Sequence, residues 1–318
     1  MQKDIIIVGG GPIGIACALE CKKKNWNYVV IEKGALTNSI YNYPRNMTFF
    51  STSEKLELDN IPFISNNPKP NRDEALEYYR RVVTSNSLNV NLYETVQQIE
   101  KIEENFVVKT DKYEYTSKKV IIASGFYDIP KLLDVQGEDL PKVKHYYNEA
   151  HPYVMQNVVV VGASNSAVDA ALEIWRKGGH VTMIVRSEQI GERVKYWVRP
   201  DIINRIKEGS IKAFFDANIT EITETTVTFA SPEGSQTIAN DFVVALTGYL
   251  PNFKFLESLG VTTSNDALKI PTYNPDTMET NVKGLYLAGV ICGGFETHKW
   301  FIENSRVHAK MIAAHIKL

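Results

Sequence analysis

The chain has 318 residues, enough for about two domains that each bury a core of their own. Apolar residues make up 44% and charged residues 23%, which excludes wholesale disorder. The net charge of −2 gives no reason to expect a nucleic acid or an anionic membrane as partner. We find no signal segment, no apolar run of membrane length and only three cysteines, so we expect a reduced, cytoplasmic protein.

The N-terminal segment predicts a βαβ unit. A continuous apolar strand at 4–8 runs into a glycine loop, then a helix that loses its apolar pattern at "KKKN", then a second strand at 28–32. The loop reads Gly9-x-Gly11-x-x-Gly14. Its glycines permit a tight turn, the approach of a pyrophosphate to the backbone, and close packing of the helix on the strand. The pattern therefore predicts a dinucleotide site, with a purely steric turn or an S-adenosylmethionine site as alternatives.

Glu32 ends the second strand, where a carboxylate accepts hydrogen bonds from ribose hydroxyls. An acid at this point repels a 2′-phosphate. The first loop, in which Pro12 and Ile13 also lie, is therefore expected to bind FAD or NAD and not NADP.

The same unit recurs about 150 residues later, over 157–186. Its loop is looser, because small residues replace two of the glycines: Gly162, Ser164, Asn165, Ser166 and Ala167. The second strand ends in Arg186 and Ser187, with no carboxylate. Arg186, with Arg193 and Lys195 downstream, is expected to hold a 2′-phosphate through charge-assisted hydrogen bonds. This arrangement favours NADPH over NADH; the alternative is that these are solvated surface cations.

Two further segments, "FVVALTGYLPN" and "GLYLAGVICGG", again read as a strand followed by glycine. We therefore predict an α/β fold with two Rossmann-like dinucleotide-binding domains. The NADPH domain, residues 127–249, is expected to be inserted into a discontinuous FAD domain made of residues 1–126 and 250–318.

The two loops together with "VIIASGFY", "VALTGYLPN" and "GLYLAGVICGG" resemble flavoprotein reductases of the thioredoxin-reductase type. The strings "NSIYNYPRNMTFFSTSEKLELDNIPF", "VQGEDLPKVKHYYNEAHPY" and "METNVKGLYLAGV" narrow the resemblance to the bacillithiol-disulfide reductase family, the YpdA-like proteins. The similarity covers almost the whole chain. It implies FAD in the first loop, NADPH in the second, and a homodimer.

The resemblance also implies further cofactor-binding residues. They are Lys33, Thr48, Ser51, Val96, Ala123, Gly125, Gly248, Gly289, Val290, His298 and Lys299. Most flavoproteins of the wider class have an aspartate that binds the ribityl chain where Val290 stands, a substitution that the resembled family shares. The family lacks a Cys-x-x-Cys pair, and so does this chain.

One departure from the family concerns the thiol chemistry. The family's first motif reads Gly-Gly-Gly-Pro-Cys-Gly, with the cysteine as the proposed redox residue, and Ile13 stands at that position here. Cys17 and Cys21 are four residues apart on a helix, too far for a disulfide, and are expected to be buried packing thiols.

Cys292 follows the 288–290 turn, which in this class meets the flavin. A helix beginning near Thr297 would lower the pKa of its thiol, so Cys292 is a candidate attacking thiolate and otherwise a small packing residue. His298 is a candidate proton donor beside the flavin, and otherwise structural.

Four functions remain open. The first is reduction of a low-molecular-weight disulfide such as bacillithiol disulfide. The second is electron delivery to a small redox protein, as in ferredoxin/flavodoxin–NADP reductases. A monooxygenase is third, although its characteristic segment between the loops is missing. The fourth is a flavin redox sensor without fast turnover.

Overall fold

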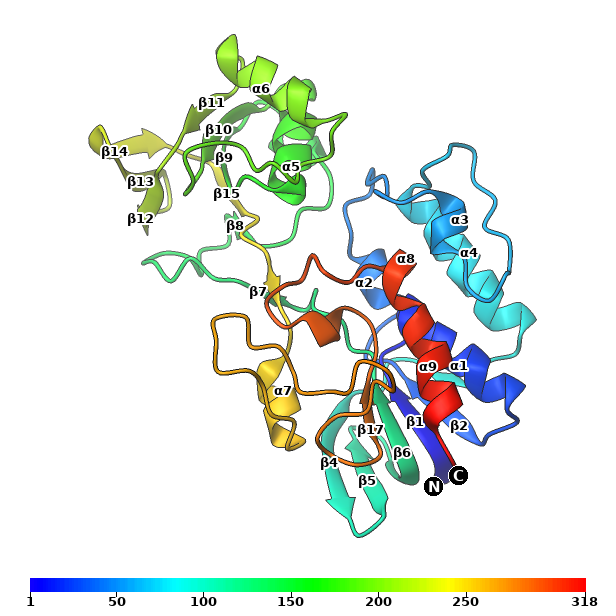
Figure 1. Ribbon diagram of the computed structural model, residues 1–318. Coiled ribbons are helices and arrows are strands. Elements are labelled where there is room, and N and C mark those ends of the chain that lie inside the picture. Colours follow the sequence, from blue (N-terminus) through cyan, green and yellow to red (C-terminus); the bar gives the residue numbers. More distant parts are fainter. The chain divides into compact units, whose positions relative to one another are not determined.

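The computed structural model describes all residues, 1–318, and divides them into two compact units (Figure 1). Unit 1 comprises residues 1–42, 47–129 and 249–318, and unit 2 comprises residues 43–46 and 130–248. The chain passes between them through two short strands that pair with each other, β7 (Ile129–Pro130) and β16 (Tyr249–Leu250). The predicted insertion of one dinucleotide-binding fold into another is confirmed.

Unit 1 is built on a seven-stranded sheet. Its strands are β1 (Gln2–Val8), β2 (Tyr28–Ile31), β3 (Val90–Asn91), β4 (Val96–Ile102), β5 (Asn105–Thr110), β6 (Glu114–Ile122) and β17 (Leu285–Leu287). The order β3-β2-β1-β6 is parallel, and β17 extends it by pairing in parallel with residues 120–122 of β6. The first half of β6 pairs antiparallel with β5, which pairs with β4. Parallel strands buried on both faces explain the continuous apolar run of β1.

Among the helices of unit 1, α1 (Pro12–Lys23) and α9 (Val307–His315) lie side by side, and the short α8 (Ile302–Ser305) directly precedes α9 (Figure 1). The remaining helices are α2 (Asn38–Tyr41), α3 (Ser53–Leu56), α4 (Arg72–Ser85), α7 (Phe253–Ser258) and the 3₁₀ turn η2 (Val290–Gly293). α1 is buried along almost its whole length, since α9 covers the side that the sheet leaves open.

Unit 2 has a five-stranded parallel sheet in the order β11-β10-β9-β15-β8 and a three-stranded antiparallel sheet, β12-β13-β14. The first comprises β8 (Val143–Lys144), β9 (Asn157–Val161), β10 (His180–Ile184), β11 (Lys212–Phe214) and β15 (Phe242–Ala245); the second, β12 (Asn218–Ile222), β13 (Thr226–Ser231) and β14 (Gly234–Ala239). Helices α5 (Asn165–Arg176) and α6 (Arg199–Lys207) and the 3₁₀ turn η1 (His151–Tyr153) complete it. A β9-α5-β10 unit was predicted here, and it is confirmed.

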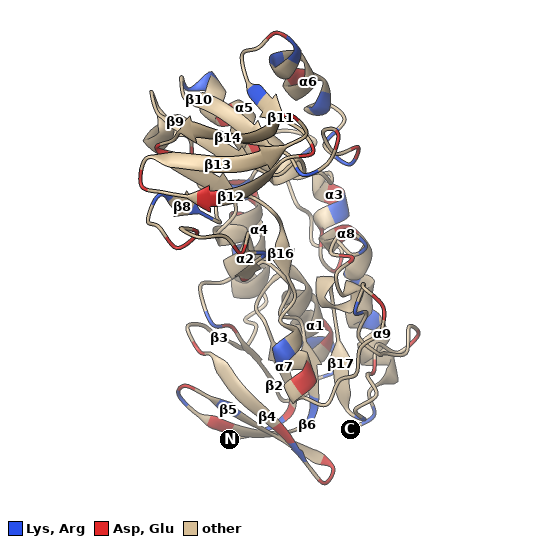
Figure 2. Ribbon diagram, turned by 90° about the vertical axis from the view of Figure 1, so that its left-hand side faces the viewer, with Lys and Arg blue, Asp and Glu red and all other residues tan.

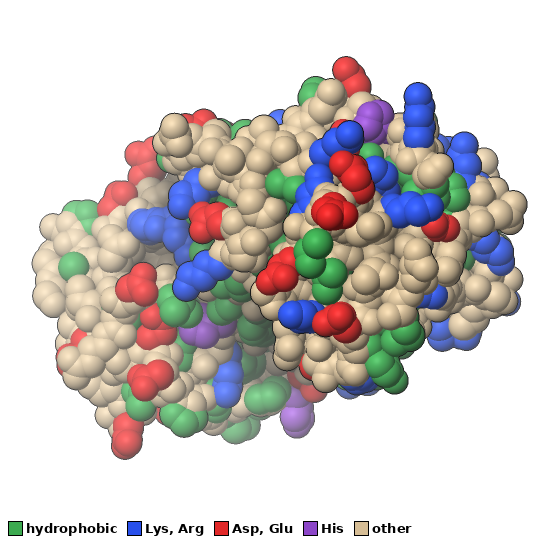
Figure 3. Space-filling model, turned by 90° about the horizontal axis from the view of Figure 1, so that it is seen from below, with side chains coloured by type: hydrophobic (Ala, Val, Ile, Leu, Met, Phe, Trp, Pro, Cys, Tyr) green, Lys and Arg blue, Asp and Glu red, His purple; other side chains and the backbone are tan.

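None of the helices combines the length and apolar character that a bilayer crossing requires. Lysines and arginines are interspersed with acidic residues over both units (Figure 2). The face drawn in Figure 3 likewise shows basic, acidic and apolar side chains mixed together. This mixture agrees with the near-zero net charge.

Candidate cofactor-binding sites

The first cradle, residues 9–14 between β1 and α1, depends on glycine at two positions. Gly9 has φ +109°, and a Cβ there would lie 2.5 Å from the carbonyl oxygen of Ala123 at the end of β6. A Cβ on Gly14 would lie 1.9 Å from the carbonyl oxygen of Gly9. Neither approach is possible for a side chain, so the turn exists only with glycine at both positions.

The N-terminus of α1 is open to an anion. Its N-cap, Gly11, makes no side-chain cap, and the first turn carries no acidic residue. A Cβ on Gly11 would meet nothing within 4 Å, so free space lies beside the uncapped N–H groups. These features fit a bound pyrophosphate. The turn after β17 lies against this loop, because a Cβ on Gly289 would be 3.2 Å from Cγ1 of Ile13.

The carboxylate of Glu32 is buried at the end of β2 and fixed by two backbone groups. Oε2 accepts from the N–H of Gly10 at 2.7 Å, and Oε1 accepts from the N–H of Gly34 at 2.9 Å. Burial raises the pKa of Glu32, and the two N–H donors oppose that shift. Each oxygen keeps a second lone pair for a ribose hydroxyl. The N–H of Glu94 donates to the Glu32 carbonyl at 3.0 Å, which brings the 94–96 segment, with Val96, to the same place.

Other residues predicted from the resemblance lie around this sheet edge. Lys33 forms an ion pair with Asp128 at 2.8 Å, which joins the segment after β2 to the one after β6 that contains Gly125. Thr48 and Ser51 are half-buried, and Thr48 forms a β-bridge with Asn71, the N-cap of α4. The structure thus brings the ends of β1, β2, β6 and β17 together.

The turn after β17 differs from the expectation. Residues 297–299 form turns, and the next helix begins at Ile302, so the prediction of a helix starting near Thr297 is wrong. The N–H groups of Glu296 and Lys299 close these turns onto the carbonyls of Gly293 and Glu296, leaving Thr297 no role as a cap. His298 and Lys299 are exposed.

The three thiols are all free and buried. Cys292 is completely buried in η2, and burial raises the pKa of its thiol, so the predicted lowering of that pKa is wrong. Burial also raises the pKa of Cys21 to about 12 and that of Cys17 well above its usual range. These are environments of packing thiols, not of attacking thiolates.

The second cradle, residues 162–167 between β9 and α5, repeats the geometry of the first within unit 2. Gly162 has φ +125°, and a Cβ there would lie 2.6 Å from the carbonyl oxygen of Leu246 at the end of β15 and 3.1 Å from Cβ of Ala167. Glycine at 162 is therefore required by both its backbone conformation and its close neighbours. Ser164 is the N-cap of α5, makes no side-chain cap, and is followed by no acid in the first turn. This N-terminus also fits a phosphate.

The segment that carries Arg193 is tied to the second cradle. The side-chain amide of Asn165 donates to the carbonyl of Arg193 at 3.2 Å and accepts from the N–H of Lys195 at 2.8 Å. The N–H of Gly191 donates to the Ala163 carbonyl at 3.0 Å. Arg193 is therefore held beside the N-terminus of α5 by backbone contacts that leave its guanidinium free of ion pairs.

The cations after β10 fall into two classes. Arg186 and Arg193 are exposed and take part in no ion pair. Lys195 is instead buried, and its Nζ lies 2.7 Å from Oδ2 of Asp169 on α5. This ion pair, in which Lys195 is buried and Asp169 half-buried, argues against the predicted role of Lys195 as a phosphate ligand. Asn165 and Asp169, four residues apart on α5, bind the backbone and the side chain of Lys195 respectively. In the sequence, this spacing was the only indication that both face the segment carrying Lys195.

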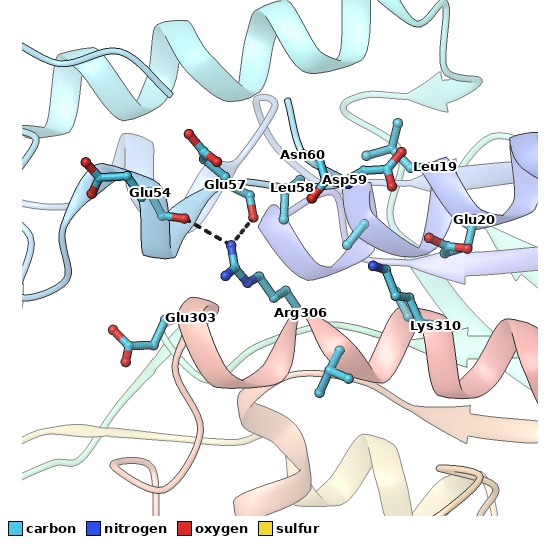
Figure 4. Close-up of a pocket in the computed structure, with 13 residues that line it drawn as sticks. Leu19, Glu20, Glu54, Glu57, Leu58, Asp59, Asn60, Glu303, Arg306 and Lys310 are labelled. Atoms are coloured by element: carbon cyan, nitrogen blue, oxygen red, sulfur yellow. Dashed lines mark hydrogen bonds between the residues drawn. The ribbon is translucent and has the colours of Figure 1, made fainter. Parts of the chain in front are cut away.

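A pocket of about 250 Å³ lies elsewhere in unit 1, between α1, α3, α8 and α9 (Figure 4). The guanidinium of Arg306 donates to the carbonyl oxygens of Glu54 and Glu57. Among the acidic residues around the pocket, Glu20 and Asp59 form ion pairs with Lys23. Its lining includes Ala16, Leu19 and Glu20 of α1 but no residue of the first cradle, so it is separate from that site.

Comparison with known proteins decides the family. Residues 6–289 match the family model for pyridine nucleotide-disulphide oxidoreductases. The chain belongs to this family. It is 46% identical to the bacilliredoxin reductase Bdr of Bacillus subtilis (strain 168), over 99% of this chain and 98% of that protein.

Two solved structures agree with this assignment. The bacillithiol disulfide reductases Bdr (YpdA) of Bacillus cereus and Staphylococcus aureus superpose with TM-scores of 0.97 and 0.96 and identities of 44% and 42%. Each comparison covers 99% of this chain and 98% of the other. The resemblance inferred from the motifs is confirmed. As a member of the pyridine nucleotide-disulphide oxidoreductase family the protein is a flavin-dependent reductase, and its cofactors are FAD and NADPH.

Proposed function

We propose that the protein reduces a low-molecular-weight disulfide, bacillithiol disulfide, at the expense of NADPH. The observation that carries the proposal is the full-length similarity to the B. subtilis reductase and to the two solved bacillithiol disulfide reductases. In the net reaction NADPH, a proton and the disulfide give NADP⁺ and two thiols. Two electrons enter the S–S bond, which breaks, and each sulfur ends with one proton.

Each cofactor is assigned to one cradle. The first cradle and its surroundings would hold FAD: Gly9, Gly11, Pro12, Ile13, Gly14, Glu32, Lys33, Thr48, Ser51, Val96, Ala123, Gly125, Gly289, Val290, His298 and Lys299. The second would hold NADPH: Gly162, Ser164, Asn165, Ser166, Ala167, Arg186, Ser187, Arg193 and Gly248. When bound, the two cofactors supply a hydride acceptor and a hydride donor. The residues of the chain supply phosphate and ribose contacts and hold the reactants in place.

We assign no thiol of the protein to the cleavage of the disulfide. Ile13 occupies the position of the family's redox cysteine, and Cys292 is fully buried with a raised thiol pKa. His298, exposed after the turn, is the group proposed to return a proton to the departing thiolate. It follows from this assignment that activity should survive treatment of the native protein with a thiol-alkylating reagent.

A second candidate acceptor is a small redox protein. The observation that favours it is the burial of all three thiols, which leaves no exposed thiol to attack a disulfide and form a mixed disulfide. Such an acceptor docks electrostatically, so its reduction falls steeply with ionic strength, whereas reduction of a small disulfide changes little.

Anaerobic stopped-flow on the holoprotein separates the candidates. The flavin is reduced with NADPH, and its reoxidation is followed with bacillithiol disulfide, glutathione disulfide or ferredoxin. Fast reoxidation by bacillithiol disulfide, unchanged in Cys292→Ala, supports the proposal, and Ile13→Cys tests whether restoring the thiol accelerates it. Reoxidation by ferredoxin alone supports the second candidate, and slow reoxidation by every acceptor identifies a sensor.

We also propose that the protein is a homodimer of the cytoplasm, as the resemblance implies. Sedimentation velocity of the purified holoprotein tests the oligomeric state: a single species of twice the chain mass supports a dimer, and a monomer refutes it.

A further inference from the structure

A buried histidine on the C-terminal helix touches the turn that ends β17. His308 is only 1% exposed, and its Nδ1 accepts a hydrogen bond from the N–H of Gly289 at 3.1 Å. Gly289 has φ +86°, and a Cβ on it would lie within 3.2 Å of Ile13, in the first cradle. A single imidazole therefore connects α9 to the turn that faces the N-terminus of α1.

The hydrogen bond fixes the protonation state of the ring. A backbone N–H can only donate, so Nδ1 carries no proton and the neutral ring has its proton on Nε2. Burial lowers the pKa of His308 to about 4, which agrees with a neutral ring at pH 7. Sγ of Cys292 lies 4.0 Å from the same nitrogen, and burial raises the pKa of that thiol. The two groups are thus both neutral, and they do not form a thiolate–imidazolium pair of the kind that activates a nucleophile.

The helix that carries His308 is held at both ends. Near its start, Arg306 donates to the carbonyl oxygens of Glu54 in α3 and of Glu57 just after it. Near its end, the hydroxyl of Tyr286 lies 3.1 Å from Nδ1 of His315. The ring of Trp300 packs edge-to-face on His308, with 4.6 Å between the ring centroids. The acceptor is therefore rigidly placed, and the Gly289 N–H has a fixed partner.

We propose that His308 is a positioning residue for FAD: it holds the 288–290 turn in the position that the bound flavin requires. The inference rests on the proposed placement of FAD at the first cradle. Without the imidazole acceptor, a buried N–H loses its partner, and the turn can satisfy it only by moving. His308 acts through Gly289 and takes no part in proton or electron transfer.

The test compares four variants by the dissociation constant of FAD, measured by titrating the apoprotein and following flavin fluorescence. In His308→Asn the amide oxygen can replace Nδ1 as acceptor, whereas His308→Gln reaches to the position of Nε2, and His308→Leu has no acceptor. The matched control is His315→Leu, which removes a histidine of the same helix that contacts β17 and not the turn. We expect FAD binding to weaken about tenfold in the Leu and Gln variants and to stay within about threefold of wild type in His308→Asn and the control.

Equal affinity of His308→Leu and wild type, or no recovery in His308→Asn, would overturn the proposal. If His308→Leu does not fold, the comparison of Asn with Gln decides alone. Failure of the FAD placement itself is recognised with Gly11→Glu, whose side chain has free space but would repel a pyrophosphate. If Gly11→Glu binds FAD as tightly as wild type, the placement of FAD is wrong. If Gly11→Glu binds FAD weakly while all His308 variants bind it as tightly as wild type, the placement stands and His308 has no positioning role. The identity of the electron acceptor does not enter this test.

Discussion

The ion pair between Lys195 and Asp169 yields a prediction that separates a structural cation from a phosphate ligand. We consider Lys195→Met, which keeps the length and apolar stem of the side chain but removes its charge. Breaking a buried ion pair costs about 3–5 kcal/mol, and breaking an exposed one costs at most about 1 kcal/mol. The Lys195 side chain is 9% exposed and that of Asp169 is 35% exposed, so the pair lies between these limits. We expect the free energy of unfolding of unit 2 to fall by about 2 kcal/mol.

The assay is thermal unfolding of the full chain together with titration of NADPH and NADH. A loss of about 2 kcal/mol lowers the midpoint of the unit 2 transition by at least about 4 °C. Lys195→Met should leave the preference for NADPH over NADH within about threefold of wild type. Asp169→Asn should destabilise the protein similarly, because it removes the same interaction from the other side.

Arg193→Met is the matched control, because its guanidinium is exposed and has no ion pair. It should leave the unfolding midpoint unchanged and weaken NADPH binding about tenfold or more, without affecting NADH, since a hydrogen bond to a charged group contributes about 1.5–3 kcal/mol. The reasoning is refuted if Lys195→Met loses NADPH affinity selectively while its unfolding midpoint stays at the wild-type value. Lys195 would then be the phosphate ligand that the sequence suggested.

Three further outcomes are expected. Gly14→Ala places a Cβ 1.9 Å from the carbonyl oxygen of Gly9, so the purified protein should lack the visible absorbance of bound flavin. Cys292→Ala should keep full turnover with disulfide while losing about 1 kcal/mol of stability from the emptied core position; loss of turnover with intact flavin reduction by NADPH would contradict the assignment. The pKa of His308 is lowered by burial from 6.5 to about 4, so the unfolded chain binds the proton more readily. The free energy of unfolding should therefore be at its full value above pH 6.5 and fall by about 3 kcal/mol as the pH decreases towards 4, measured by denaturant titration at each pH. In His308→Asn this decrease between pH 6.5 and 4 should be smaller.

The sequence predicted both βαβ units because the signals are local. A buried parallel strand is apolar along its whole length, and the glycine loops require backbone geometry that only glycine adopts, as at Gly9 and Gly162. Glu32 could be placed because the end of the second strand has a fixed relation to the loop. The partners of Lys195 and Gly289 could not be predicted from the sequence. Lys195 pairs with a residue 26 positions away and Gly289 with one 19 positions away, and no pattern in the sequence marks either contact. The prediction of a helix starting near Thr297 was wrong for a related reason. Threonine is a common N-cap, but the backbone hydrogen bonds of residues 293–299 form turns, which the local sequence does not reveal.

The burial of the thiols bears on how such a reductase can differ from its relatives while keeping its cofactors. The contacts that shape the first cradle come from glycines and backbone groups, at Gly9, Gly14 and Gly289, and none of them needs a thiol. Ile13 places aliphatic carbon beside Gly289, so this part of the cradle is packed by a side chain without a thiol. We therefore expect Ile13→Cys to leave the phosphate and ribose contacts of the first cradle intact and to act only on the step in which the reduced flavin meets its acceptor. In stopped-flow experiments, wild type and Ile13→Cys should therefore show the same rate of flavin reduction by NADPH but different rates of flavin reoxidation by the disulfide.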